Sequence, residues 1–79
     1  MKCRHTNRDY VNTHAKEPRG TGSWAFRVTV YAAVRGYTDL GIQFANGTFA
    51  AARKQVQDHA ILEAKSIGGA TEVHTETLG

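Results

Sequence analysis

The sequence predicts a small α+β domain of ββαβ order. We expect a three-stranded, mainly antiparallel sheet with one helix packed on one face and a polar N-terminal arm. Three features predict this fold. Residues 24–34 alternate between two kinds of side chain over a long stretch without Gly or Pro, residues 39–45 alternate again after a turn, and residues 49–67 have helical periodicity.

Residues 24–34 are predicted to form the central strand, because β-branched and aromatic residues fill the segment. Side chains in a strand point alternately to its two faces. The inner face then carries Trp24, Phe26, Val28, Val30, Ala32 and Val34. The outer face carries Ala25, Arg27, Thr29, Tyr31 and Ala33, and Arg35 continues that row.

The second strand is expected to return antiparallel after a turn at residues 35–38, where Gly36 is free to take a positive φ. Its alternation predicts Leu40, Ile42 and Phe44 on the inner face and Gln43 on the outer face. Gly41 indicates a β-bulge or the close approach of another backbone.

The dipeptide Asn46-Gly47 has two interpretations. It could close a second hairpin, or it could end the strand so that Thr48 becomes the N-cap of a helix. The Ala-rich residues 50–55 favour the helix, and Gly68-Gly69 should end it near Ile67. Its buried stripe is predicted to be Phe49, Ala52, Val56, Ala60, Ala64 and Ile67. Leu62 falls near the polar side, where it lies under the arm, on a partner surface or alone in solvent.

Residues 70–78 are rich in Thr and charge, which is typical of an edge strand. We expect the central strand to lie between this strand and residues 39–45, antiparallel to both. The expected division is therefore a basic, polar arm over residues 1–23 and a single ββαβ domain over residues 24–79. The whole formal net charge of +3 lies in the arm, which is broken by Pro18, Gly20 and Gly22.

No pattern in the chain indicates an enzyme, a catalytic residue, a metal site or a cofactor. The four histidines have no partners at a diagnostic spacing, and no Gly-rich phosphate loop is present. The single Cys3 cannot form an internal disulfide. No apolar run approaches the ~20 residues of a membrane span, and no signal peptide is recognisable. We therefore expect a cytoplasmic protein without a membrane partner.

The outer face of the predicted sheet is the candidate binding surface. It should present Arg27, Tyr31 and Arg35 from the central strand, with Tyr37 and Gln43 beside them. Arg and Tyr are enriched at the centres of protein interfaces. Basic and aromatic side chains on a sheet also hold single-stranded nucleic acid. A plain solvated face is the alternative.

A hairpin, one helix and a closing strand over residues 23–78 give the chain a format that resembles the small phage-encoded anti-CRISPR proteins. The resemblance is one of size and architecture. It implies a non-enzymatic inhibitor, in the cytoplasm of the host cell, that occupies a surface of a CRISPR effector complex and blocks binding of target DNA. The alternative is a small basic nucleic-acid-binding protein that uses the open sheet face and the arm. A homodimer is a further alternative.

Overall fold

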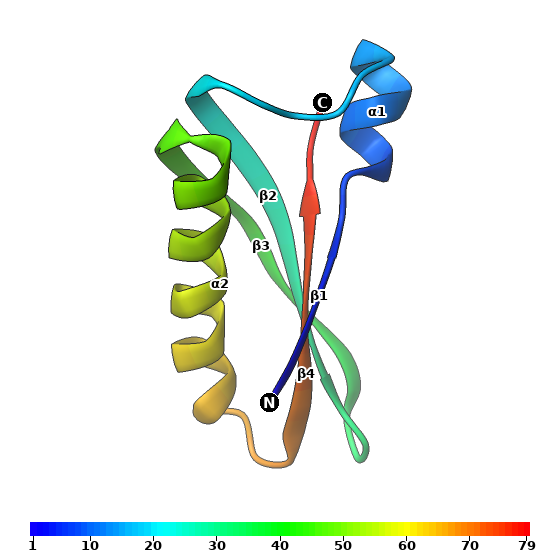
Figure 1. The fold of residues 1–79 in the computed structure, drawn as a ribbon. Helices are drawn as coiled ribbons and strands as arrows, with labels where there is room; N and C mark the ends of the chain where they lie inside the picture. Colours follow the sequence, from blue (N-terminus) through cyan, green and yellow to red (C-terminus); the bar gives the residue numbers. More distant parts are fainter.

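Residues 1–79 form a four-stranded mixed sheet and two helices in the computed structural model. Along the chain the elements are β1 (Lys2–Thr6), α1 (Arg8–His14), β2 (Thr21–Ala32), β3 (Gly36–Thr48), α2 (Phe49–Lys65) and β4 (Ala70–Thr77). The strands lie in the order β1-β4-β2-β3. Strand β1 is parallel to β4, and β2 is antiparallel to both β4 and β3 (Figure 1).

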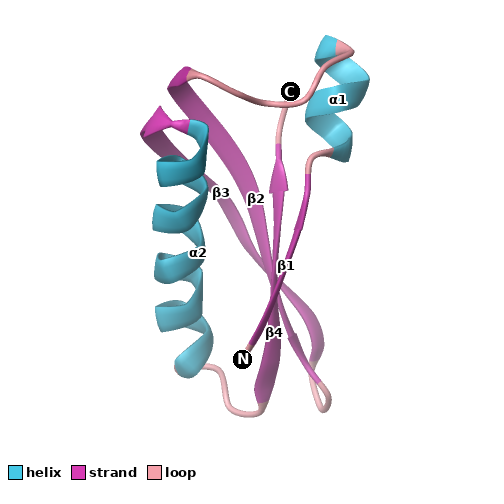
Figure 2. Ribbon diagram, viewed as in Figure 1, coloured by secondary structure: helices cyan, strands magenta, loops and turns pink.

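The helices cover only part of the sheet. Helix α2 runs along one face, and the short helix α1 lies at one end of the sheet near the C-terminus (Figure 2). The face covered by α2 is called the inner face below, and the opposite one the open face. The α+β class, the central place of β2 and its antiparallel neighbours were predicted correctly.

The N-terminal segment was predicted incorrectly. Residues 2–6 pair with β4 as a fourth strand, with Lys2 opposite Glu72 and Thr6 opposite Glu76. Strand β4 therefore lies between β1 and β2 and is not the expected edge strand. Helix α1 then carries Tyr10 onto Trp24, with ring centroids 5.8 Å apart. The expected arm thus contributes a strand and a helix to the same fold.

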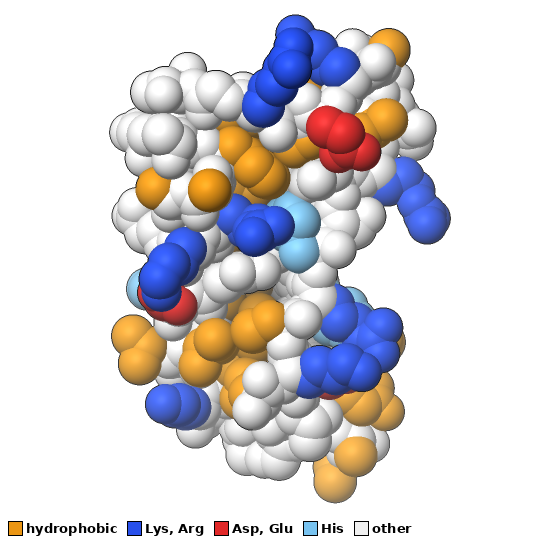
Figure 3. Space-filling view, viewed as in Figure 1, with side chains coloured by type: hydrophobic (Ala, Val, Ile, Leu, Met, Phe, Trp, Pro, Cys, Tyr) orange, Lys and Arg blue, Asp and Glu red, His pale blue; other side chains and the backbone are white.

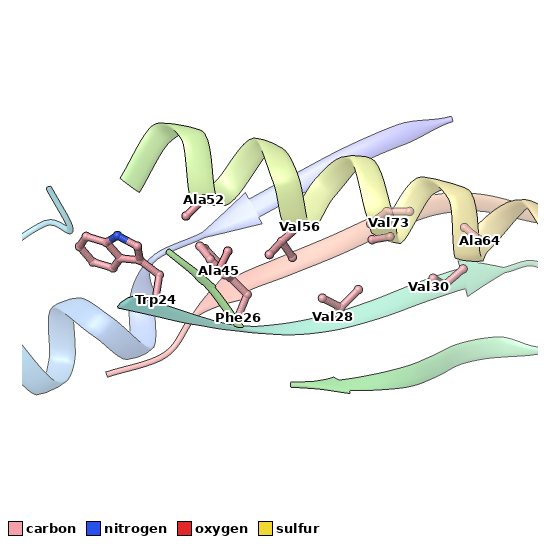
Figure 4. Packing of buried hydrophobic residues seen from close by; sticks show 10 residues of the cluster. Trp24, Phe26, Val28, Val30, Ala45, Ala52, Val56, Ala64 and Val73 are labelled. Carbon is pink, nitrogen blue, oxygen red and sulfur yellow. The ribbon is translucent and has the colours of Figure 1, made fainter. Parts of the chain in front are cut away.

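The core lies between α2 and the inner face of the sheet (Figure 4). Strand β2 contributes Trp24, Phe26, Val28 and Val30, as its alternation predicts. Helix α2 contributes a stripe of small side chains, which lets the helix approach the sheet closely. The stripe consists of Ala52, Val56, Ala60 and Ala64. Thr48 is the N-cap, and its Oγ1 accepts a hydrogen bond of 3.2 Å from the backbone N–H of Ala51. The predicted N-cap and the middle of the predicted stripe are confirmed, whereas Phe49 and Ile67 are only partly buried and the helix ends at Lys65, before Ile67.

A β-bulge in β3 changes which side chains face the core. Val28 pairs with Gly41 and Thr29 pairs with Asp39, so Leu40 is an extra residue with no partner. Gly41 has a φ of 87°, a conformation that glycine adopts readily, and its N–H donates to Asp39 Oδ1 at 2.7 Å. Because the bulge adds one residue, the alternation is reversed after it. Residues of β3 beyond the bulge therefore point to the face opposite to the one expected from an unbroken alternation.

The consequence is a correction for two predicted core residues, Ile42 and Phe44. Leu40 does pack against the core, but Ile42 and Phe44 lie on the open face and are 48% and 77% exposed. Val34, also expected in the core, lies in the turn after β2 and is 95% exposed.

Candidate functional site

The open face is built from three rows of side chains that cross all four strands. Residues that are directly opposite in neighbouring strands share a face, so the pairing register defines these rows. The first row is Lys2, Glu72, Tyr31 and Tyr37. The second row is Arg4, His74, Thr29 and Asp39. The third row is Thr6, Glu76, Arg27 and Ile42. Phe44 extends the face beyond Ile42 along β3.

An aromatic cluster lies where the first two rows meet. The rings of Tyr31 and Tyr37 are 4.9 Å apart, and the Tyr37 ring meets the His74 ring edge-on at 5.5 Å with an interplanar angle of 88°. Tyr37 is 65% exposed. Such contacts hold aromatic rings in fixed orientations. The cluster therefore presents Tyr37 to solvent as a supported platform.

Beside this cluster, Glu72 contacts the side chains of Arg4 and His74. Arg4 Nε donates to Glu72 Oε1 at 3.1 Å, and His74 Nε2 lies 3.5 Å from Glu72 Oε2. The hydrogen bond from Arg4 is the main cause that lowers the pKa of the Glu72 carboxyl, and the bond from His74 adds to it. Glu72 is thus ionised near neutral pH and fixes the position of Arg4.

A hollow of about 480 Å³ lies on the open face over β4. Its eight lining residues include no apolar side chain. Arg4 lies on one flank and Arg27 on the other, with His74 and Glu76 between them. Arg27 makes no hydrogen bond or ion pair with the protein, so its guanidinium is free to bind a ligand.

An exposed apolar row follows the outer strand β3. It consists of Tyr37, Ile42 and Phe44, which are 65%, 48% and 77% exposed, and Asp39 lies between Tyr37 and Ile42 on the same face. Strand β3 is an edge strand, so one side of its backbone has no partner within the sheet. The apolar row and the unpaired backbone lie together at one margin of the open face.

The ionic groups of the chain are paired unevenly. Six of the seven acidic side chains accept a hydrogen bond or form an ion pair within the protein, and Glu76 is the exception. Of the ten Lys and Arg side chains, only Arg4 and Lys54 have an acidic partner. In Figure 3 the Lys and Arg side chains are spread over the visible surface, and few acidic side chains lie among them. The charge available to a partner is therefore predominantly positive.

The structure brings together three of the five predicted site residues. Arg27, Tyr31 and Tyr37 lie on the open face, as expected. Arg35 lies outside the rows, in the exposed turn at residues 33–35. The prediction for Gln43 was wrong: it lies on the inner face, where its Nε2 donates to Glu63 Oε1 at 3.1 Å.

The sequence interpretation missed four members of the face. Arg4 was placed in the polar N-terminal arm and His74 in an edge strand, because nothing nearby marks their pairing. Ile42 and Phe44 were placed in the core. For these two the signal was present, because the bulge indicated at Gly41 shifts all later residues of β3 to the other face.

Comparison with protein-family models, with curated proteins and with solved structures finds no match to this chain. No group of three or more His, Cys, Asp or Glu side chains is arranged to hold a metal ion. Neither helix has the length and apolar character needed to cross a membrane.

Proposed function

We propose that this protein is a non-catalytic binding protein that covers a surface of a protein partner with the open face of its sheet. The observation that carries this proposal is the exposed row of Tyr37, Ile42 and Phe44 beside the charged rows. Large apolar side chains that lie together in solvent, flanked by polar groups, are typical of interaction sites.

The free edge of β3 supports the same proposal. An extended segment of a partner can pair with the unpaired backbone of an edge strand, and side chains on the adjacent face then provide specificity. The part of β3 after the bulge carries Ile42 and Phe44 in alternate positions on one face. This part is available for such pairing.

The partner that we propose is a CRISPR effector complex, which fits the resemblance in size and format to anti-CRISPR proteins. In this form of the proposal the open face covers the surface that target DNA must reach, in the cytoplasm of an infected host cell. The excess of unpaired cations supports a partner whose exposed surface is acidic or contains nucleic acid.

The test is binding of the purified protein to purified effector complexes, measured by co-elution and by the ability of the complex to retain target DNA. Phe44→Ala should weaken association by at least about tenfold, because truncation of an exposed aromatic anchor removes contact area at the interface. Leu62→Ala is the matched control, since Leu62 is also large and 65% exposed but lies on α2.

Two outcomes contradict the proposal. Equal weakening by Phe44→Ala and Leu62→Ala argues against the open face as the docking surface. Failure of the unaltered protein to bind effectors of every type tested rejects the CRISPR form of the proposal.

A further inference from the structure

The hollow on the open face has two arginine flanks at a defined separation. Arg4 is on β1 and Arg27 is on β2, and β4 runs between these strands. Neighbouring strands are about 4.8 Å apart, so the two flanks are about 10 Å apart at the backbone. Arg4 uses only its Nε for Glu72, and Arg27 makes no bond within the protein. Both guanidiniums therefore retain donors for an anionic ligand.

The hollow adjoins the aromatic cluster at His74. His74 lines the hollow and also meets the ring of Tyr37 edge-on. A ligand that contacts both the arginines and Tyr37 must therefore have acidic groups where it meets the arginines and a flat apolar surface where it meets Tyr37. Phosphodiesters and bases have this combination.

We propose that this part of the open face binds a segment of single-stranded nucleic acid. Its phosphates are held by Arg4 and Arg27, and a base stacks on the exposed ring of Tyr37. Bases of a single strand are free to stack on aromatic side chains, whereas those of a duplex are already stacked on each other.

The lining of the hollow favours nucleic acid over a protein segment. A protein anchor is usually an apolar or aromatic side chain in a desolvated pocket, and this hollow has no apolar lining residue. Glu76 is the one acidic side chain in the lining, and it lies opposite Arg27 in the register. A carboxylate at that position can accept a hydrogen bond from the amino group of a base, as in contacts with cytosine.

This inference goes beyond the protein-docking proposal. Tyr37 belongs to both surfaces, but binding of nucleic acid depends on the hollow between Arg4 and Arg27, whereas protein docking depends also on Ile42 and Phe44. The two proposals can therefore fail separately, and Phe44→Ala distinguishes them because it should leave binding of nucleic acid unchanged.

The experiment is fluorescence anisotropy of a labelled single-stranded oligonucleotide, as RNA and as DNA, titrated with the full chain at several salt concentrations. We expect Arg27→Ala to weaken binding about tenfold at low salt and to reduce the salt slope by about one. Tyr37→Ala should weaken binding by about fivefold or more, through loss of stacking. A duplex of the same sequence should compete poorly.

Lys65→Ala is the matched control. It removes the same charge from another unpaired cation, which lies in the last turn of α2 and outside the hollow. We expect it to change binding less than twofold, because it contributes only to the general field. Circular dichroism of each variant verifies the fold, and Arg27 is exposed on the central strand, so its truncation is tolerated.

Three results overturn the inference. The first is no binding of any oligonucleotide at low salt. The second is an equal loss of affinity in Arg27→Ala and Lys65→Ala, which indicates nonspecific attraction. The third is Arg27-dependent binding of an acidic polyglutamate peptide with no binding of oligonucleotides, which assigns the hollow to a protein segment.

Discussion

Two phenylalanines illustrate how different the two faces of the sheet are. Phe26 is fully buried on the inner face, with its ring 6.1 Å from that of Phe49 and 6.2 Å from that of His5. Phe44 lies on the open face and is 77% exposed. The same side chain is therefore held by its neighbours on one face and is available to a partner on the other.

The difference between the faces separates stability from binding. The inner face is covered by α2 and contains the whole apolar core. The open face has charged rows, an aromatic cluster and a hollow, with no helix over them. Substitutions on the inner face should therefore change the free energy of unfolding, and substitutions on the open face should change affinity for a partner.

The largest expected effect is that of Phe26→Ala. Truncation of a fully buried Phe typically costs ~3–5 kcal/mol, through lost burial and the cavity that remains. Since native domains have a free energy of unfolding of only ~5–15 kcal/mol, this loss removes a large share of the stability and should lower the urea midpoint strongly. Phe44→Ala is the control and should change the free energy by less than ~0.5 kcal/mol in urea titration. Similar midpoints for the two variants would contradict the assignment of the faces.

A smaller effect on the free energy of unfolding is expected at the bulge that places Ile42 and Phe44 on the open face. Gly41 has a φ of 87°, and an added Cβ would meet no atom within 4 Å. Gly41→Ala should therefore cost ~1–2 kcal/mol through backbone strain alone. Gly22→Ala is the matched control, because its φ is not in the left-handed region and its added Cβ is also unobstructed. Equal free energies of unfolding for the two variants would show that the bulge does not require glycine.

The elements that could be predicted from sequence are those with an uninterrupted apolar period. Strand β2 alternates from Trp24 to Ala32, and α2 has a continuous buried stripe, so both were identified with nearly correct bounds. The bulge in β3 breaks the period at Leu40, and every later residue changes face. Gly41 indicates the bulge in the sequence, but the register with β2 is needed to show which residues change face.

The missed N-terminal strand has a different physical cause. The inward-facing His5 of β1 is polar, so the segment has no apolar alternation. It is held instead by backbone pairing with β4 and by a hydrogen bond of 2.7 Å between His5 Nδ1 and the Thr75 hydroxyl. Thr75 and Thr77 are buried, and their partners lie about seventy residues away in sequence. Buried threonines satisfied by distant residues cannot be distinguished by pattern from exposed ones.

A third test concerns the junction between β3 and α2. Thr48→Ala removes the hydrogen bond from the Ala51 N–H to the Thr48 hydroxyl and should cost about 1 kcal/mol. Thr48→Ser keeps the accepting oxygen and should restore most of the free energy of unfolding. The measurement is urea titration of both variants. A loss in Thr48→Ser as large as that in Thr48→Ala would show that the cap bond is not the cause.

The subtlest effect is a dependence of stability on pH through His5, on the inner face. Burial is the main cause that lowers the pKa of His5, and Arg53 lowers it further against the opposing effects of Asn7 and Glu76. Asn7 Oδ1 can only accept, so Nε2 donates to it and the neutral Nδ1 accepts from the Thr75 hydroxyl. Protonation of Nδ1 would place two donors against each other unless the buried hydroxyl turned away.

The sign of this dependence follows from the lowered pKa. Below the ordinary histidine pKa of about 6.5, the unfolded chain takes up a proton at His5 that the folded chain does not. The contribution of neutral His5 to the free energy of unfolding should therefore be complete above pH 6.5. It should decrease as the pH falls toward the lower pKa of His5 in the folded state. Urea titrations from pH 8 to pH 5 measure this change. His5→Gln should reduce the slope in that range, and an equal slope in the variant would show that the loss of stability arises at other groups.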